Sequence, residues 1–297
     1  MKEITDYGKV FETLVTKTAD YLIQNNIKAQ ILGISGGIDS TVVAAICHEV
    51  SKRTGIPLIG RSLPTKFNKE GETTTADLVG KAFCNDYKIF DINQIYFSYL
   101  LQIKLSEEYE PIEFPVTNGN IQARLRMIYL YNLASIKGGL VMDTDNLTEN
   151  NLGYFTIHGD VGDFNPIGCL WKTEVFKLAE WLMNWYGSYT HTYFYTDAPE
   201  IIDYKQGNLA KAVAIRESLK LKPTAGLGIT DSDLDEIGAE SYDQVDRILK
   251  CLTDNSISTD TIDDIPDAIL EAVVKRHNAS KFKRKQLPIK IAREEIV

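Results

Sequence analysis

The sequence is poor in the features that mark secreted, membrane-spanning and cysteine-metal proteins. Its four cysteines, Cys47, Cys84, Cys169 and Cys251, are widely spaced and form no CxxC pair, so neither a zinc site nor a dithiol redox site is predicted. No apolar run approaches the roughly 20 residues that a membrane span requires. The N-terminal segment MKEITDYGKV lacks the apolar core of a signal peptide. We therefore expect a cytoplasmic protein with no membrane partner.

Basic residues are also fewer than acidic ones. The chain carries 32 Lys and Arg against 41 Asp and Glu, which gives a formal net charge of -9. A surface that binds nucleic acid is normally basic, so no nucleic-acid partner is expected, and any anionic ligand has to be held by local groups. The 297 residues are 44% hydrophobic and 25% charged, which is ordinary for a globular protein. We interpret residues 1–297 as a single domain.

Segments with strand and helix patterns alternate over the first half of the chain. Apolar residues at helical spacing predict an opening helix over Ile4–Ile23. This alternation is typical of βαβ units and predicts an α/β fold with a doubly wound, mainly parallel sheet covered by helices on both faces. A loop-rich stretch over 151–168, a helix over Trp171–Trp185 and a mainly helical C-terminal part from Gly207 are expected to follow. The predicted strands are 30–34, 57–63, 87–92 and 139–144, and the helices between them are 38–52, 69–83 and 120–136.

The turn GISGGIDS, Gly33–Ser40, lies between the first predicted strand and its helix. Consecutive backbone N–H groups beside a helix N-terminus favour an anion, and a phosphate is the expected ligand. Asp39 would repel a phosphate unless a cation lay between them, so the turn indicates phosphate together with a divalent metal. The stretch MDTDNLTE, residues 142–149, follows another predicted strand. We expect both stretches at the same edge of the sheet, because the carboxyl ends of parallel strands meet there.

Two common nucleotide motifs are absent from this turn. It has neither the lysine of a Walker A loop nor the pattern GxGxxG. The remaining sequence, SGGIDS, resembles the SGGxDS loop of the ATP pyrophosphatases, which split ATP between its α and β phosphates. The alternative is a structural turn in which Gly36 and Gly37 supply unusual backbone angles and Ser40 caps the helix. That alternative does not account for Asp39.

Five further segments follow the turn in a fixed order. Together with SGGIDS they resemble the NAD synthetase family. The resemblance spans most of the chain, and six ordered segments are far more specific than one loop. The five segments are NGNIQARLRM (118–127), TDNLTENNLGYFTIHGD (144–160), LWKTEV (170–175), KPTAGL (222–227) and SKFKRKQLP (280–288).

This resemblance implies an adenine nucleotide alpha hydrolase-like fold and a defined reaction. The family forms the amide of NAD from the nicotinate carboxylate of deamido-NAD, using ATP, ammonia and Mg²⁺. A carboxylate is a poor electrophile, because its leaving group would be oxide. Adenylation replaces that leaving group by AMP and releases pyrophosphate, so the site has to neutralise the charge of the triphosphate.

The resemblance also implies roles for individual residues. Asp39 and Glu149 would hold Mg²⁺, since oxygen ligands suit this ion, and Lys172 would neutralise the transition state. The alternatives are a solvated carboxylate for Glu149, a surface salt bridge for Arg124 and a solvated basic tail. The catalytic set is Asp39, Lys172 and Thr224. The ATP-binding set is Gly33, Ser35, Gly36, Gly37, Asp39, Ser40, Arg124, Thr144, Lys172 and Thr224, and the deamido-NAD set is Asp160, Lys283 and Arg284.

Four positions depart from the family pattern. Asp143 replaces a glycine, Gly226 an aspartate, Phe282 a histidine and Gln122 a frequent lysine. The first two exchange acidic and neutral groups around the site, so we expect an effect on substrate details.

Members of the family that use glutamine carry a separate amidase domain. Here the first strand of the core begins near residue 30, so free ammonia is the expected nitrogen donor, unless an amidase partner delivers it. By resemblance the chain forms a homodimer whose deamido-NAD site uses both subunits. The same chemistry on another acceptor, such as nicotinate mononucleotide, a xanthine nucleotide or a tRNA base, is one alternative. A nucleotide-binding protein without catalysis is the other.

Overall fold

The strands in the described part of the chain form one parallel sheet. The structure is a computed structural model that describes residues 3–106, 114–191, 199–223, 233–254, 256–285, 289–290 and 293–295. Within them the sheet has the order β3-β2-β1-β4-β5-β6, which confirms the predicted doubly wound α/β fold. The direction of strand addition reverses between β1 and β4. The strands are β1 Gln30–Gly33, β2 Leu58–Ser62, β3 Asp86–Ile89, β4 Leu140–Met142, β5 Phe164–Asn165 and β6 Ile289–Lys290.

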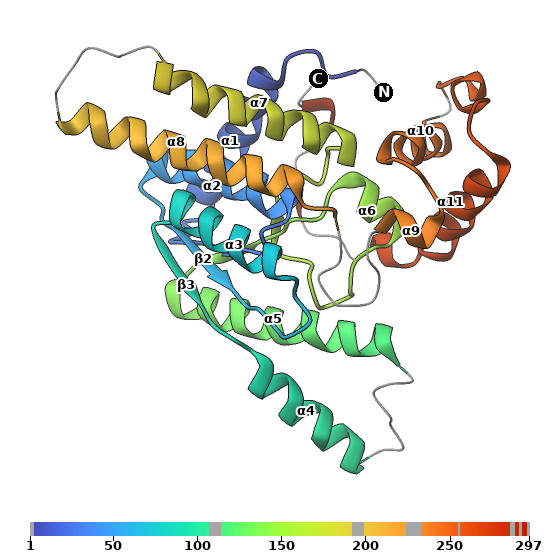
Figure 1. Ribbon diagram of the computed structural model, residues 1–297, viewed down its shortest axis with the longest axis horizontal. Helices are drawn as coiled ribbons and strands as arrows, with labels where there is room; N and C mark the ends of the chain where they lie inside the picture. The colour runs from blue at the N-terminus through green and yellow to red at the C-terminus, as the bar shows by residue number, and fades with distance from the viewer. Residues whose placement is uncertain are drawn as a thin grey trace.

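Helices cover both faces of the sheet. Successive residues of a strand point to opposite faces, and in β1 Leu32 joins one hydrophobic cluster while Ile31 joins another. The first cluster is formed with α1 Tyr7–Gln24, α2 Ile38–Thr54, α3 Glu70–Phe83, α7 Lys172–His191 and α8 Pro199–Lys220. The second is formed with α5 Pro115–Lys137, and α4 Asn93–Ser106 packs outside α5 (Figure 1).

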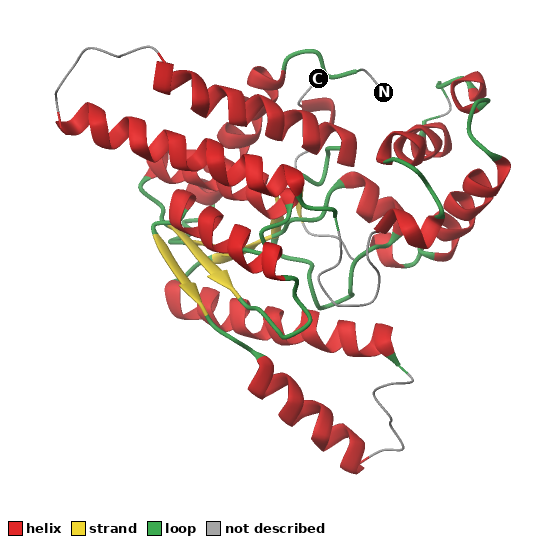
Figure 2. Ribbon diagram, viewed as in Figure 1, coloured by secondary structure: helices red, strands yellow, loops and turns green. Residues whose placement is uncertain are grey.

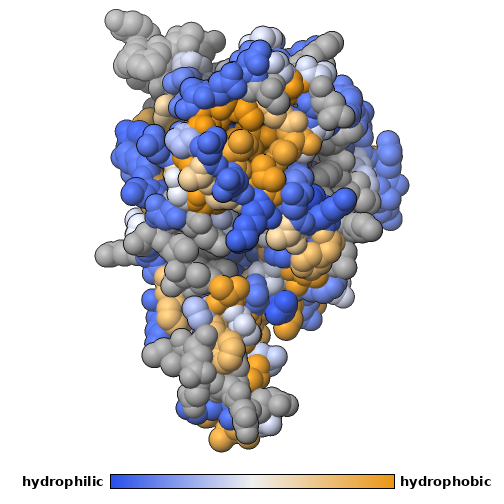
Figure 3. Space-filling view, turned by 90° about the vertical axis from the view of Figure 1, so that its right-hand side faces the viewer, coloured by the Kyte–Doolittle hydropathy of each residue, from blue (hydrophilic) through white to orange (hydrophobic). Residues whose placement is uncertain are grey.

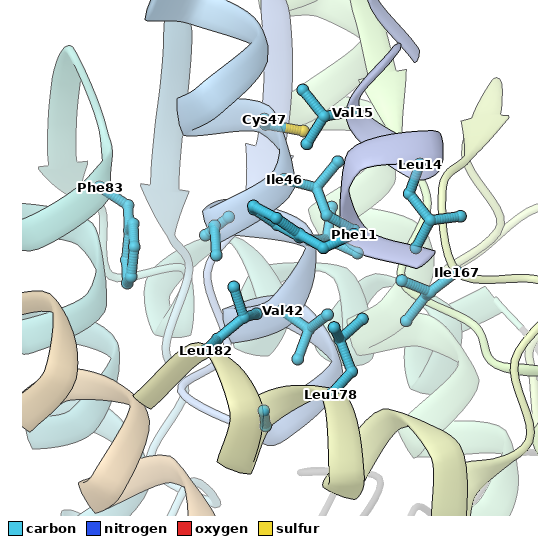
Figure 4. Close-up of a cluster of buried hydrophobic side chains, with 14 of the residues drawn as sticks. Phe11, Leu14, Val15, Val42, Ile46, Cys47, Phe83, Ile167, Leu178 and Leu182 are labelled. Atoms are coloured by element: carbon cyan, nitrogen blue, oxygen red, sulfur yellow. The ribbon is translucent and has the colours of Figure 1, made fainter. Parts of the chain in front are cut away.

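The larger cluster fixes the helix that carries the glycine-rich turn. Helix α2 is buried along most of its length, and Val42 and Ile46 pack among Phe11 of α1 and Leu178 of α7 (Figure 4). Burial of such a side chain contributes about 1.5–3 kcal/mol to folding. The N-terminus of α2 is therefore held rigidly against the end of β1.

A third cluster lies beside the sheet rather than on it. It joins α6 Leu147–Leu152 to the C-terminal helices, and it buries Leu152, Trp171 and Val245 (Figure 1). The mainly helical C-terminal part is thus confirmed. Its elements are α9 Asp233–Ile237, α10 Tyr242–Thr253, the 3-10 helix Thr259–Ile262, α11 Asp267–Ala279, and the 3-10 helices Lys283–Lys285 and Arg293–Glu295. Figure 2 shows loops gathered between the sheet and these helices.

Some elements differ from the predictions. Helix α4 was not predicted, because only Tyr96 and Leu100 of its side chains are buried and most of its other apolar residues are exposed. Helix α6 has six residues and β5 has two, too few for a periodic pattern. The opening helix begins at Tyr7 rather than Ile4, because the Asp6 side chain accepts a hydrogen bond from the backbone N–H of Lys9 and caps it. No helix within the described ranges is long and apolar enough to cross a membrane.

Candidate functional site

The glycine-rich turn joins β1 to α2. The N-cap of α2 is Gly37, whose carbonyl accepts hydrogen bonds from the Ser40 and Thr41 hydroxyls at 3.0 and 2.9 Å. The Ser35 and Ser40 hydroxyl oxygens lie 2.9 Å apart. The first N–H groups of a helix have no acceptor inside the helix. The turn therefore offers hydroxyl and backbone donors to an anion at the positive end of the α2 dipole.

Gly36 lets this turn approach α3. Its φ is +86°, in the left-handed region, and a Cβ atom there would lie 2.4 Å from the Glu72 carbonyl oxygen. Helix α8 supports the turn from behind, because the Ser218 hydroxyl donates to the Gly36 carbonyl at 2.9 Å. Gly36 is thus required for backbone geometry and packing.

Asp39 lies where the sheet changes direction. It is in the first turn of α2, and Asn146, the N-cap of α6, follows β4. The Asn146 side-chain amide donates to Asp39 Oδ1 at 2.8 Å. The Asn146 side-chain oxygen, Oδ1, in turn accepts hydrogen bonds from the backbone N–H groups of Thr148 and Glu149. The stretches after β1 and β4 therefore do meet at one edge of the sheet, as predicted from the parallel arrangement.

Lys172 supplies the cation that Asp39 requires. Its Nζ lies 2.6 Å from Asp39 Oδ2 and 2.8 Å from Glu149 Oε1, and its side chain is 1% exposed. Burial is the largest single effect on the pKa of Lys172 and acts to lower it. The charges of Asp39 and Glu149 together outweigh burial and raise this pKa well above its ordinary value. Lys172 is therefore a permanently charged ammonium between two carboxylates.

Two further carboxyl groups line the same cleft. Burial raises the pKa of Asp145 well above its ordinary value, and the neighbouring charge of Asp143 adds to this rise. Burial also raises the pKa of Asp160 to about 6, although backbone hydrogen bonds from Thr156 and Asp160 itself oppose the rise. Asp145 Oδ2 has no hydrogen-bond partner among the described residues. Its protonated form could therefore donate a hydrogen bond to a bound ligand.

The cleft has a volume of about 370 Å³ and lies at the carboxyl edge of the sheet. Its walls come from both sides of the switch point and from α5, α7 and the C-terminal part. Of the residues that the sequence nominated, the following line it: Gly33, Ser35, Gly37, Asp39, Ser40, Thr144, Glu149, Asp160, Lys172 and Lys283.

The structure places two arginines of α5 on different sides of the helix, and the one that was predicted to contact ATP lies outside the cleft. Arg124, predicted to contact ATP, is exposed and lies outside the cleft lining, and it donates to the Ile157 carbonyl at 3.4 Å. Arg126 lines the cleft and donates to the Leu63 carbonyl and to Asn68 Oδ1 at 3.0 and 3.2 Å. Residues two apart face different sides of a helix, so the arginine of α5 that lies in the cleft wall is Arg126. The hydrophobic pattern of α5 gives no signal that separates the two arginines in the sequence.

The C-terminal basic pair is bound to the protein itself. Lys283 Nζ donates to the carbonyls of Gly153 and Phe155 at 2.8 and 2.6 Å, at the cleft wall. Arg284 donates to the Asn151 carbonyl at 2.9 Å and is not part of the cleft lining. Thr224 lies outside the residues that the structure describes.

The departures from the family pattern also have positions in the structure. Asp143 is 1% exposed and absent from the cleft lining, and its carboxylate accepts from the backbone N–H of Gly162 at 2.7 Å. Gln122 is buried and accepts from the Thr65 hydroxyl at 2.8 Å. Phe282 is 63% exposed. Gly226 lies outside the described residues. Asp143 therefore anchors a loop beside the cleft, and the expected effect of this departure on substrate details stays a prediction.

Comparison with known proteins assigns this arrangement to a family. The family described as NAD synthase matches residues 10–287. The NH3-dependent NAD+ synthetase of Pyrococcus horikoshii is 30% identical over 99% of this chain and 98% of its own length, and that of Pyrococcus furiosus is 31% identical over 94% of each. The solved NMN synthetase of Francisella tularensis is 25% identical, with a TM-score of 0.73 over 96% of this chain and 99% of its own. The chain belongs to the NAD synthase family and is thereby a C–N bond-forming ligase of NAD biosynthesis.

Proposed function

We propose that the chain amidates deamido-NAD to NAD with ammonia, at the expense of ATP, through an acyl-adenylate. The observation that carries this proposal is the Lys172 ammonium held between Asp39 and Glu149, beside the phosphate-binding turn. The names of the Pyrococcus relatives, which are NH3-dependent NAD+ synthetases, support the same reaction. Residues 1–297 act as one domain, since α6 contributes both to the cleft and to the C-terminal cluster.

The first step joins the two substrates. A carboxylate oxygen of the nicotinate group attacks the α-phosphorus of ATP, and the bond from that phosphorus to pyrophosphate breaks. The hydroxyls of Ser35 and Ser40 and the N–H groups that begin α2 would hold the departing phosphates. Lys172 stays protonated and balances the charge that accumulates on the pentavalent phosphorus, because its pKa is raised.

The second step forms the amide. Ammonia attacks the carbonyl carbon of the acyl-adenylate, the bond to AMP breaks, and one proton is lost. Asp160 lies in the cleft wall with a pKa of about 6, so at neutral pH it is mainly a carboxylate that can accept hydrogen bonds from the nicotinate end or the nitrogen nucleophile. Lys283 and Arg126 supply the positive charges near Asp160 and would contact the dinucleotide, while Arg284 would hold the segment that carries Lys283.

The residues present fit a magnesium ion. Asp39 and Glu149 already share one cation, the Lys172 ammonium, and their oxygens are hard donors. No group of three or more potential metal ligands occurs within the described ranges, so phosphate oxygens of ATP and water would complete the coordination. Bound there, Mg²⁺ would neutralise the triphosphate. Thr144 would lie beside the ribose and adenine, and Thr224 beside the phosphates.

We further propose that the chain acts as a homodimer. Apolar side chains are exposed along α4 and α5, at the lower end of the molecule in Figure 3, where hydrophilic residues lie among them. Exposed apolar surface of this kind is typical of protein interfaces. Because α5 also lines the cleft, an interface on α4 and α5 would place a second subunit near the site. The exposed apolar residues there are Ile95, Phe97, Tyr99, Leu101, Leu105, Val116, Ile128, Tyr131 and Ile136.

A second acceptor has support from one relative. The solved protein with a TM-score of 0.73 is described as an NMN synthetase, so nicotinate mononucleotide is the alternative substrate. Both acceptors carry the same nicotinate carboxylate and need the same adenylation step. The alternative of a nucleotide-binding protein without catalysis loses its support with the family assignment.

One experiment tests the reaction and the acceptor together. The purified protein is incubated with ATP, Mg²⁺ and ammonium, in parallel with deamido-NAD or nicotinate mononucleotide, and the nucleotides are separated by chromatography. We expect AMP and NAD in a ratio of one with deamido-NAD. Nicotinamide mononucleotide in the second reaction alone would move the proposal to the other acceptor, and intact ATP in both would overturn it. Replacing ammonium by glutamine is expected to abolish product.

The variant Asp39→Asn is the matched control. It keeps the size of the side chain and the hydrogen bond from Asn146 but removes the charge that Lys172 neutralises. We expect AMP formation to be abolished while the far-UV circular dichroism spectrum stays unchanged. A fully active variant would contradict the role of Asp39 in binding the metal.

A further inference from the structure

Helix α10 lies against the first turn of α7, where Lys172 is located. Tyr242 and Asp246 are four residues apart on α10, so they lie on the same face of the helix. The Lys172 Nζ is 5.5 Å from the centre of the Tyr242 ring. The Asp246 side chain is buried and accepts a hydrogen bond from the backbone N–H of Thr173 at 3.0 Å. Neither Tyr242 nor Asp246 lines the cleft, and neither takes part in the bond changes proposed above.

Asp246 fixes the backbone at Lys172. The first N–H groups of α7 have no acceptor within the helix. The N–H of Lys172 donates to the Thr148 hydroxyl at 2.8 Å, and that hydroxyl donates to Asp246. Asp246 thus joins α10 to α6 through Thr148 and to α7 through Thr173. A carboxylate at this end of a helix is also favoured by the helix dipole.

Tyr242 acts on the other end of the lysine side chain. A cation over an aromatic ring is attracted by the negative face of that ring. Lysine has a long, flexible stem, and confining it costs conformational entropy. Asp39 and Glu149 bind the ammonium through hydrogen bonds, and the Tyr242 ring adds a contact from the C-terminal part.

We propose that Asp246 and Tyr242 are positioning residues for Lys172, so that helix α10 sets the rate of adenylation without touching either substrate. The proposal rests on the catalytic role proposed above for Lys172. A charge that is already in place before the reaction stabilises a transition state better than one that has to be reorganised. Loss of either residue is therefore expected to lower kcat while the KM values for ATP and the acceptor stay unchanged.

The Tyr242 ring is tested by a matched pair of variants. Tyr242→Phe keeps the ring, and Tyr242→Leu removes it while keeping an apolar side chain. We expect Phe to retain kcat within about twofold and Leu to lower it about fivefold, which corresponds to about 1 kcal/mol. Both should keep the two KM values within about twofold. Equal kcat values for Tyr242→Phe and Tyr242→Leu, or a change confined to KM, would overturn the proposal that the ring positions Lys172.

The Asp246 carboxylate is tested in the same way. Asp246→Asn keeps one oxygen that can accept hydrogen bonds from Thr148 and Thr173, whereas Asp246→Ala keeps none. We expect kcat to fall more than tenfold in Asp246→Ala and by a smaller factor in Asp246→Asn. Circular dichroism and cooperative unfolding serve as the controls that both variants are folded. Native kcat in folded Asp246→Ala would contradict the proposal.

A double-mutant cycle with Lys172→Met separates this proposal from the one on which it rests. If α10 acts through Lys172, Tyr242→Leu should have no further effect on kcat in the Lys172→Met background. Inactive Lys172→Met together with native α10 variants would refute positioning by α10 and leave the catalytic role of Lys172 intact. Active Lys172→Met would refute that catalytic role, and positioning by α10 with it.

Discussion

Gly36 provides the sharpest test of how the phosphate-binding turn is built, through the substitution Gly36→Ala. The φ of Gly36 is +86°, and an added Cβ would lie 2.4 Å from the Glu72 carbonyl oxygen and 2.8 Å from the Ala76 nitrogen. The left-handed conformation costs an alanine about 1–2 kcal/mol. The overlap with the backbone of α3 adds about 1–3 kcal/mol, because the turn or the helix has to shift. We expect the free energy of unfolding to fall by about 2–5 kcal/mol.

Substitutions at two other glycines measure the backbone cost and the packing cost separately. Gly55 has a φ of +75°, and an added Cβ would meet no surrounding atom within 4 Å, so Gly55→Ala isolates the backbone cost of about 1–2 kcal/mol. Gly37 has an ordinary φ of -66°, and its Cβ would meet the Ser35 hydroxyl oxygen at 3.4 Å. Gly37→Ala weakens only an N-cap position and is expected to cost at most about 1 kcal/mol.

Unfolding in urea, followed by tryptophan fluorescence, measures all three variants, and an unchanged m value shows that the comparison is valid. The turn that approaches α3 also faces the phosphates, so Gly36→Ala should raise the KM for ATP as well. Gly55 lies at the far end of α2 and its variant should not. If Gly36→Ala is no more destabilising than Gly55→Ala, the close contact between the turn and α3 does not contribute to the cost, and this reasoning is refuted.

Two further predictions concern the charged groups of the cleft. Arg126→Met should raise the KM of at least one anionic substrate tenfold or more, and Arg124→Met should change it less than twofold, since of these two arginines Arg126 alone lines the cleft. The reverse result would assign the substrate contact to Arg124. Burial raises the pKa of Asp160 to about 6, so the carboxyl is protonated below this pH and ionised above it. The kcat/KM for the acceptor should therefore rise as the pH increases through about 6 in the native enzyme and show no such rise in Asp160→Asn. A pH profile shared by both proteins would show that Asp160 does not titrate in the reaction.

Much of the site could be predicted from local pattern and sheet topology. The alternation of strands and helices required a parallel sheet, and a parallel sheet brings the ends of β1 and β4 together. Asp39 and Asn146 are 107 residues apart and are joined by a hydrogen bond of 2.8 Å. The position of Lys172 has no local signal, because it depends on where α7 begins. It could be expected only from the family resemblance.

Other features could not be predicted, because they depend on packing. Whether Arg124 or Arg126 reaches the cleft depends on the rotation of α5 about its axis, which the hydrophobic cluster beneath it sets through Met127 and Leu130. Tyr242 and Asp246 carry no motif, and they contact Lys172 and Thr148 only because a separate hydrophobic cluster holds α10 beside α6. Such contacts follow from tertiary structure alone.

Asp143 shows how a departure from the family pattern can act on the site from outside it. Its carboxylate accepts hydrogen bonds from the backbone N–H groups of Asp145 and Gly162, both at 2.7 Å, and from the Asn165 amide at 2.9 Å. These donors lie on both sides of the loop that carries Asp160. Restoring the glycine of the family pattern by Asp143→Gly leaves all three donors without this acceptor.

The cost of that change follows from the burial of the group. Each buried donor left without a partner costs about 1–3 kcal/mol, so Asp143→Gly should lower the free energy of unfolding by at least about 3 kcal/mol. The loosened loop should raise the KM for the acceptor more than the KM for ATP. Asp143→Asn retains one acceptor oxygen and should fall between the two proteins in both measurements. Native stability in Asp143→Gly would mean that other groups satisfy these donors, and the loop would then be held without Asp143.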